Sequence, residues 1–182
     1  TRGLIALSQV SGITEETNNK IQIGIDNLIA KQKLSGAFGY WDRNSAVYER
    51  FQPYAVDTLQ KTLPFSNDKE KVKAAIKKGL EYLYRTSLRD AETKLYSYGL
   101  LAKAGYEVTS RARYSIDQEL QSDVMQIMKA SNNSVMQIDD LVLAYWVAAN
   151  LNDTKRMLQI SDNARFALGQ MTSQEPVLQL IS

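Results

Sequence analysis

Three tyrosines recur at nearly equal spacings in similar apolar surroundings. Tyr54, Tyr98 and Tyr145 stand about 45 residues apart, and a short apolar run follows each of them. A period of that length accommodates a helix, a turn, a returning helix and a connection, which is the unit of stacked helical hairpins. We therefore expect the three tyrosines to occupy equivalent positions on successive inner helices.

The chain shows a helical pattern along nearly all of its length. Apolar residues recur at spacings of three and four, and Gly36 and Gly105 mark two of the helix ends. Thr14 before two glutamates predicts a capped helix start, and so does Asn67 with Glu70 three residues later. The expected helices cover residues 4–10, 16–33, 51–62, 69–85, 90–104, 110–128 (as one or two helices), 138–151 and 153–170 (again as one or two); the segment 173–182 is not assigned. No convincing period-two segment precedes it, so strands are few or absent.

The expected helices fall into two classes. Those that carry the repeated tyrosines are apolar on nearly every side, whereas the helices at 16–33, 69–85 and 110–121 have one apolar face. A helix that is apolar on every side has to be buried on every side, so we expect an inner layer of helices covered by an outer one. This predicts an all-α fold: a single helical domain over residues 1–182, shaped as an α/α toroid or incomplete toroid built of helical hairpins.

The extent of the chain favours the incomplete toroid. A full ring of six hairpins would need roughly 270 residues, more than the 182 present. We therefore expect an open apolar flank near residues 1–10 or 176–181, where another segment or a neighbouring copy would pack.

An aromatic loop lies between the expected helices 16–33 and 51–62. Phe38, Tyr40 and Trp41 occupy three of four consecutive positions, next to Gly36 and Gly39. Burying each large ring stabilises the fold by roughly 1.5 to 3 kcal/mol, so we expect the three rings to pack inward and hold consecutive hairpins together. The other interpretation is a surface loop with scattered exposed aromatic residues.

Composition and charge restrict the classes of function. The formal net charge is only +2, which gives no basic field for nucleic acid, and the lysines between residues 69 and 78 fit a solvated helix face. The longest apolar run, 141–151, is shorter than the roughly 20 residues that a membrane-spanning helix needs. We expect neither a nucleic-acid partner nor a membrane span in this segment.

The side chains that usually carry catalysis are scarce. The chain has no histidine and no cysteine, so it offers no thiolate zinc site and no histidine base for a nucleophile; a Ser–Lys pair stays open, but nothing marks one. The acidic doublet Asp139-Asp140 fits a first helical turn, where carboxylates are favourable; the alternative is a metal or acid role. We expect no enzyme activity, no catalytic or metal-binding residue and no cofactor.

Residues 23–32, 36–41 and 54–59 closely resemble the thioester-domain region of bacterial alpha-2-macroglobulins, which are large toroid-bearing protease inhibitors of the Gram-negative periplasm. The strong part of the resemblance covers about residues 21–62. This chain has Ser35-Gly36-Ala37 where the family usually has Asp-Gly-Gly, and Pro53 where threonine is common. The resemblance implies a part of an endopeptidase inhibitor, with target proteases and neighbouring domains as partners. It also implies a periplasmic location, with anchoring to the inner membrane through the parent protein as a further option.

The resemblance also concerns a thioester. Family members that trap proteases covalently carry a Cys-x-x-Gln motif, which by the family's spacing would lie about one helix upstream of Thr1. The chain opens in a helical pattern without methionine, so we expect it to be a piece of a longer protein. Because it lacks cysteine, this segment would shelter a thioester or serve as a packing module, and it cannot form the bond itself.

Two other functions are open from the sequence. One is a free-standing helical-repeat scaffold that binds a peptide or protein on its concave face. The other is an isoprenoid-handling enzyme, because the glycine-aromatic loop with its preceding glutamine is similar to the repeat of terpene cyclases. The missing acidic cluster and zinc ligands disfavour it.

Overall fold

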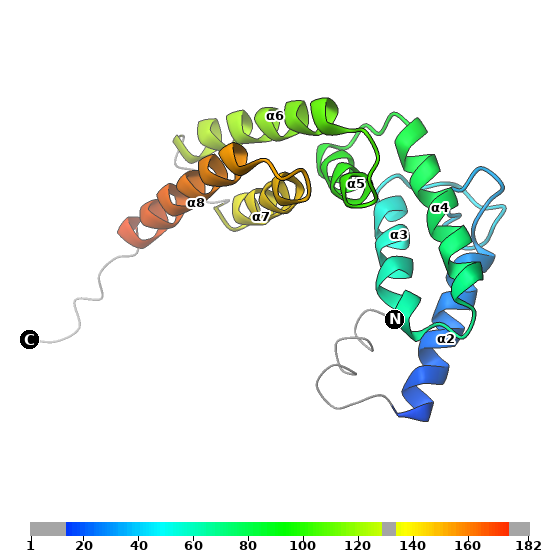
Figure 1. The fold of residues 1–182 in the computed structure, drawn as a ribbon. Coiled ribbons are helices and arrows are strands. Elements are labelled where there is room, and N and C mark those ends of the chain that lie inside the picture. Colours follow the sequence, from blue (N-terminus) through cyan, green and yellow to red (C-terminus); the bar gives the residue numbers. More distant parts are fainter. Residues whose placement is uncertain (1–13, 129–133, 175–182) are drawn as a thin grey trace, which may run out of the picture. The chain divides into compact units, whose positions relative to one another are not determined.

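The computed structural model describes residues 14–128 and 134–174, which form helices joined by loops and turns (Figure 1). The α-helices are α2 (Glu15–Ala30), α3 (Phe51–Thr62), α4 (Lys69–Arg85), α5 (Ala91–Lys103), α6 (Thr109–Met128), α7 (Ser134–Asn150) and α8 (Thr154–Gln174), and a 3-10 turn, η1, covers Leu63–Phe65. Within the described ranges there is no strand, only an isolated bridge between Gln32 and Phe38. The expected all-α fold is confirmed. The expected helix at 4–10 and the flank at 176–181 lie outside the described residues.

Local sequence signals account for most helix ends. Thr14 caps α2 by accepting a hydrogen bond from the Thr17 amide at 3.2 Å, as expected. The expected cap at Asn67 is wrong by one residue: Asp68 accepts from the Lys71 amide at 2.9 Å, and its carboxylate also suits the positive end of the helix dipole. Gly105, at φ +82°, follows the end of α5 in the left-handed conformation that glycine adopts easily.

Of the two possibilities left open for residues 110–128, the structure has one helix, α6. The start of α7 differs from the expectation. Helix α7 begins at Ser134, because the segment before Ile138 contains no helix breaker, so Asp139 and Asp140 lie in its second turn and not in its first. The expected capping role of this doublet is therefore wrong. No helix in the described ranges is both long and apolar enough to cross a membrane.

The residue contacts divide the chain into two compact units, residues 1–93 (unit 1) and 94–182 (unit 2). The expectation of one helical domain and that of a ring stay predictions. In unit 1, α2, α3 and α4 pack against one another in all three pairings (Figure 1). Their buried side chains include Ile21, Ile25, Val56, Leu59, Val72 and Leu80. The lysines of α4 point to solvent, as predicted, while α3 is buried on most of its sides.

In unit 2, α7 packs against both α6 and α8. The core is a cluster of buried side chains from α5, α6, α7 and α8: Leu95, Ala112, Ile116, Leu141, Ala144, Val147, Ala148 and Ile160. The ring of Trp146 lies directly over Gly99, since a Cβ atom on that glycine would stand 2.0 Å from the ring. The missing side chain at position 99 therefore lets α5 and α7 come together around an indole.

Candidate functional site

The connection between α2 and α3, residues 31–50, lies close against α4. Gly36 has φ +93°, and a Cβ atom there would stand 2.1 Å from the carbonyl oxygen of Lys78. At Gly39 a Cβ atom would stand 1.8 Å from the carbonyl oxygen of Asp42. Only glycine fits these two close backbone approaches, so both glycines set the course of the loop.

Phe38 anchors the loop in the core of unit 1. Its side chain is 1% exposed, which confirms the expected burial. The ring lies near Gly79 of α4, where a Cβ atom would approach Val56 to 2.6 Å and Phe38 to 3.3 Å. The small residue at position 79 thus allows the loop and α3 to pack on α4 together.

Two buried glutamines fasten the backbone around Phe38. Gln52, 1% exposed, accepts from the Phe38 amide at 2.7 Å and donates to the carbonyl oxygens of Phe38 and Tyr48 at 2.9 and 3.0 Å. Gln32 donates to the carbonyl oxygens of Gly36 and Ala75 at 3.1 and 2.8 Å. Sequence reasoning assigned no role to Gln52, because no local pattern shows which backbone groups a buried amide will satisfy.

Tyr40 and Trp41 do not follow Phe38 into the core. Tyr40 is 42% exposed and Trp41 76%, so the expected inward packing is wrong for Trp41 and holds only in part for Tyr40. The physical reason is a tight turn: the Ser45 hydroxyl accepts from the Trp41 amide, and the Asp42 carboxylate accepts from the Asn44 and Ser45 amides. This turn fixes the backbone beside the two rings, which remain exposed.

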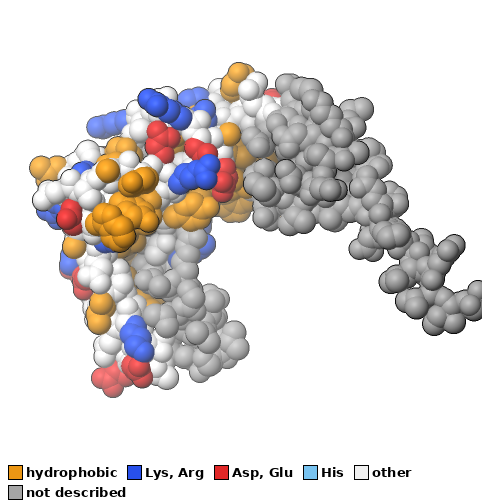
Figure 2. Space-filling view, turned by 180° about the vertical axis from the view of Figure 1, so that it is seen from behind, with side chains coloured by type: hydrophobic (Ala, Val, Ile, Leu, Met, Phe, Trp, Pro, Cys, Tyr) orange, Lys and Arg blue, Asp and Glu red, His pale blue; other side chains and the backbone are white. Residues whose placement is uncertain are grey.

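The exposed rings contact one another. The Tyr40 centroid lies 4.8 Å from those of Trp41 and Tyr48 and 6.2 Å from that of Phe51. We call Tyr40, Trp41, Tyr48 and Phe51 the aromatic cluster. Figure 2 shows that hydrophobic side chains gather on one described face, with charged side chains beside them.

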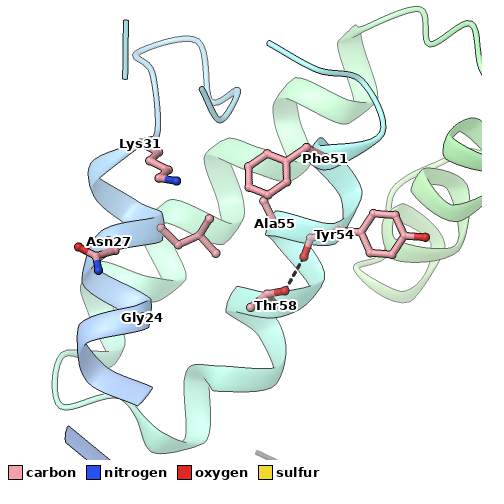
Figure 3. A pocket seen from close by; sticks show the side chains of 8 residues that line it. Gly24, Asn27, Lys31, Phe51, Tyr54, Ala55 and Thr58 are labelled. Atoms are coloured by element: carbon pink, nitrogen blue, oxygen red, sulfur yellow. Dashed lines mark hydrogen bonds between the residues drawn. The ribbon is translucent and has the colours of Figure 1, made fainter. Parts of the chain in front are cut away.

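A groove between α2 and α3 adjoins the aromatic cluster (Figure 3). Its volume is about 490 Å³, and it is lined by Gly24, Asn27 and Leu28 of α2, by Lys31 just after that helix, and by Phe51, Tyr54, Ala55 and Thr58 of α3. On each side these residues stand at positions i, i+3, i+4 and i+7, which lie on one helix face. The Phe51 ring points toward α2, so this residue belongs to both the groove and the cluster (Figure 3).

The loop carries charges of both signs beside the cluster. The carboxylates of Asp42 and Glu49 accept hydrogen bonds from the backbone amides of Ser45 and Arg89. Among the described residues, no carboxylate forms an ion pair with Lys31, Lys33 or Arg43, and the Lys31 ammonium donates to the Tyr40 carbonyl oxygen at 3.1 Å. Arg50, by contrast, pairs with Asp90 at 2.7 Å. The hydrogen bond from the Thr93 hydroxyl, together with Arg50, lowers the pKa of Asp90 from its ordinary value.

The three repeated tyrosines lie on alternate helices. Tyr54 is on α3, Tyr98 on α5 and Tyr145 on α7. Tyr54 and Tyr145 are each 40% exposed, and Tyr98 is half-buried. The Tyr54 ring points away from the groove (Figure 3), and its hydroxyl donates to Glu92 at 3.3 Å. Their equivalence on an inner layer stays a prediction.

Unit 2 holds a second polar cluster, which the sequence did not reveal. Asp153, 7% exposed, precedes α8 and accepts from Arg113 at 2.7 Å and from Arg156 at 3.0 Å, while Arg156 also donates to Asp117 at 2.6 Å. Burial acts to raise the pKa of Asp153, but the Arg156 amide and the two guanidinium groups lower it below its ordinary value. Every member has a partner, so the cluster fastens α6 to α8. The described residues contain no group of three or more carboxylate, histidine or cysteine side chains placed to hold a metal ion.

No family model and no curated protein sequence matches the chain. Its fold is similar to that in a crystal structure of trypsin-activated alpha-2-macroglobulin from Escherichia coli, with a TM-score of 0.60 and 19% identity. The match covers 90% of this chain and 11% of that protein, so the chain spans about a tenth of its length. At this identity the similarity establishes the fold. The chain therefore has the all-α fold of a stretch of that alpha-2-macroglobulin.

Proposed function

We propose that this chain is the helical thioester-type domain of an alpha-2-macroglobulin-like protease inhibitor, and that the longer protein acts in the periplasm of a Gram-negative bacterium. One observation carries the proposal: 90% of the chain shares its fold with a stretch of the Escherichia coli protein. The resemblance of residues 23–32, 36–41 and 54–59 to the same family, which rests on sequence, supports it independently.

In this proposal the domain acts by packing and by taking part in protease capture, not by catalysis. The chain has neither the cysteine of a thioester nor a histidine base, so any covalent chemistry has to come from another segment of the longer protein. What the chain supplies is two helical units, one of which carries an exposed aromatic cluster. These are the properties of a module that contacts proteins.

The experiment compares two substrates of trypsin after the protease has been mixed with the longer protein. A trap that encloses the protease blocks a large protein substrate but leaves a small chromogenic peptide accessible. We expect cleavage of the protein substrate to be largely lost while cleavage of the peptide is retained. Equal loss of both activities would indicate an active-site inhibitor, and no loss of either would favour the free-standing scaffold; both results contradict the proposal.

A separate experiment tests the proposed periplasmic location. The longer protein should be released with periplasmic marker proteins on osmotic shock, or sediment with the inner membrane if it is anchored there. Recovery with cytoplasmic markers contradicts this part of the proposal.

A further inference from the structure

We propose that the aromatic cluster and its adjoining groove form a docking surface for an apolar segment, rimmed by carboxylates, from another domain of the same longer protein. The inference rests on the proposed function, because it requires the chain to be one part of a longer inhibitor. It adds the surface, the chemistry of its partner and the residues that select that partner.

The aromatic cluster exposes more apolar surface than isolated surface residues do. Trp41 is 76% exposed and Tyr48 57%, and Leu34, in the same loop, is 93% exposed. Phe51 joins these rings to the groove of about 490 Å³, so the apolar surface continues between α2 and α3. Contiguous apolar surface of this kind marks contact sites for other proteins.

The surface is also pre-organised. The rings contact one another, the turn at Asp42 and Ser45 fixes the backbone below Trp41, and Gln52 holds the base of the loop through three hydrogen bonds. Rigid tyrosine and tryptophan side chains lose little conformational entropy on binding, so they contribute a large share of binding energy at interfaces. If the loop served only to pack against α4, its exposed rings would not need the hydrogen bonds that hold the backbone beside them.

The charges at its edge indicate the partner. Lys31, Lys33 and Arg43 lie on the loop and its flank and have no ion-pair partner among the described residues. Complementary charges at the rim of an interface steer association and suppress wrong partners. The surface therefore fits a segment with apolar side chains for the cluster and groove, and with aspartate or glutamate beside them.

The partner's source follows from the length of the related protein. The matched stretch is 11% of the Escherichia coli alpha-2-macroglobulin, so about nine tenths of that protein is available to contact such a module. A segment of the same chain is present at high effective concentration, which favours it over a separate protein. We therefore assign the surface to an intramolecular interface.

The test places a photo-crosslinking amino acid at position 41 of the longer protein, and mass spectrometry maps the products. We expect an intramolecular product with an acidic segment outside residues 1–182. The double variant Lys33→Glu/Arg43→Glu should lower its yield by about tenfold. The matched control Lys69→Glu/Lys77→Glu reverses two exposed lysines of α4 that belong neither to the groove nor to the aromatic cluster, and it should leave the yield unchanged.

Three results would overturn the inference: no product above the level of an unirradiated sample, products between separate copies whose yield rises with concentration, or equal yields in the two double variants. The substrate comparison with trypsin separates the two proposals. If trapping persists while any of these results is found, only the docking surface is refuted; if trapping is absent as well, the proposed function fails too.

Discussion

The two tryptophans of this chain have opposite environments. Trp41, in unit 1, is 76% exposed and contacts Tyr40 edge-on at 4.8 Å. Trp146, in unit 2, lies over Gly99 and packs against the buried core, with Tyr96 at 5.6 Å. A tryptophan is thus exposed in one unit and packed against the core in the other. Whether a tryptophan is buried depends on whether a neighbouring helix leaves space for its ring, as Gly99 does for Trp146.

The units also differ in how their polar groups fasten the structure. In unit 1, the neutral amides of Gln32 and Gln52 satisfy backbone groups of the aromatic loop. In unit 2, Asp153 with Arg113 and Arg156 fastens the start of α8 through charges. Both units contain a carboxylate whose pKa is lowered, but Asp90 of unit 1 pairs with an exposed Arg50, whereas Asp153 of unit 2 is buried between two arginines. We therefore expect loss of a buried amide to destabilise unit 1, and protonation of Asp153 to destabilise unit 2.

The largest expected effect concerns Trp146. Trp146→Ala should lower the free energy of unfolding of unit 2 by about 2 to 4 kcal/mol, because it leaves a cavity over Gly99. Denaturant unfolding followed by circular dichroism measures the change. Val142→Ala is the control on the same helix, where a 63% exposed side chain should cost less than about 1 kcal/mol. An equal decrease in the free energy of unfolding for the two variants would show that the Trp146 ring does not stabilise unit 2 by packing.

The second effect tests the glutamine fastening of unit 1. Gln52→Leu should destabilise unit 1 by about 1 to 3 kcal/mol, because the buried Phe38 amide loses its acceptor. Gln60→Leu on the same helix is a matched control: the Gln60 side-chain oxygen is buried without a hydrogen-bond partner among the described residues, so its removal should be neutral or stabilising. The idea fails if Gln60→Leu costs as much as Gln52→Leu.

A third, smaller effect is the pH dependence of unit 2. The pKa of Asp153 is lowered on folding, so its contribution is present above the ordinary value of 3.8 and is lost as the pH falls through the folded value. Asp153→Asn should cost about 1 to 2 kcal/mol at pH 7, because Arg113 and Arg156 lose their shared partner, and it should flatten the fall in stability below about pH 4.

The measurement is a series of denaturant unfolding curves between neutral and acidic pH, with Trp146 fluorescence in a Trp41→Phe background as the reporter of unit 2. Asp162→Asn serves as control, since that carboxylate is 75% exposed and 3.8 Å from Arg165. A wild-type and an Asp153→Asn chain with the same acid dependence would refute the charge fastening.

The smallest expected effect is that of Trp41. Because most of its ring faces solvent, Trp41→Ala should change the free energy of unfolding by less than about 0.5 kcal/mol. In the 182-residue chain, acrylamide should quench Trp41 more than Trp146, measured in the single-tryptophan variants Trp146→Phe and Trp41→Phe. If Trp41→Ala lowered the free energy of unfolding by more than about 2 kcal/mol, the inward packing expected from the sequence would be supported instead.

The amino-acid sequence by itself determined the fold class and most helix ends. Apolar residues at spacings of three and four predicted the helices, and Thr14 and Gly105 marked their limits, because capping and left-handed backbone are properties of single residues and their neighbours. The burial of Phe38 was predicted from the density of aromatic residues beside two glycines, but the same argument failed for Trp41.

Only the tertiary structure decided where the other aromatic rings point and what holds them. Tyr40 and Trp41 carry large aromatic rings like Phe38, yet they lie exposed beside the turn at Asp42 and Ser45. The roles of Gln52 and Asp153 likewise depend on partners 14 and 40 residues away in the chain. Burial, hydrogen-bond satisfaction and ion pairing are relations between distant residues, so they exist only once the helices have packed.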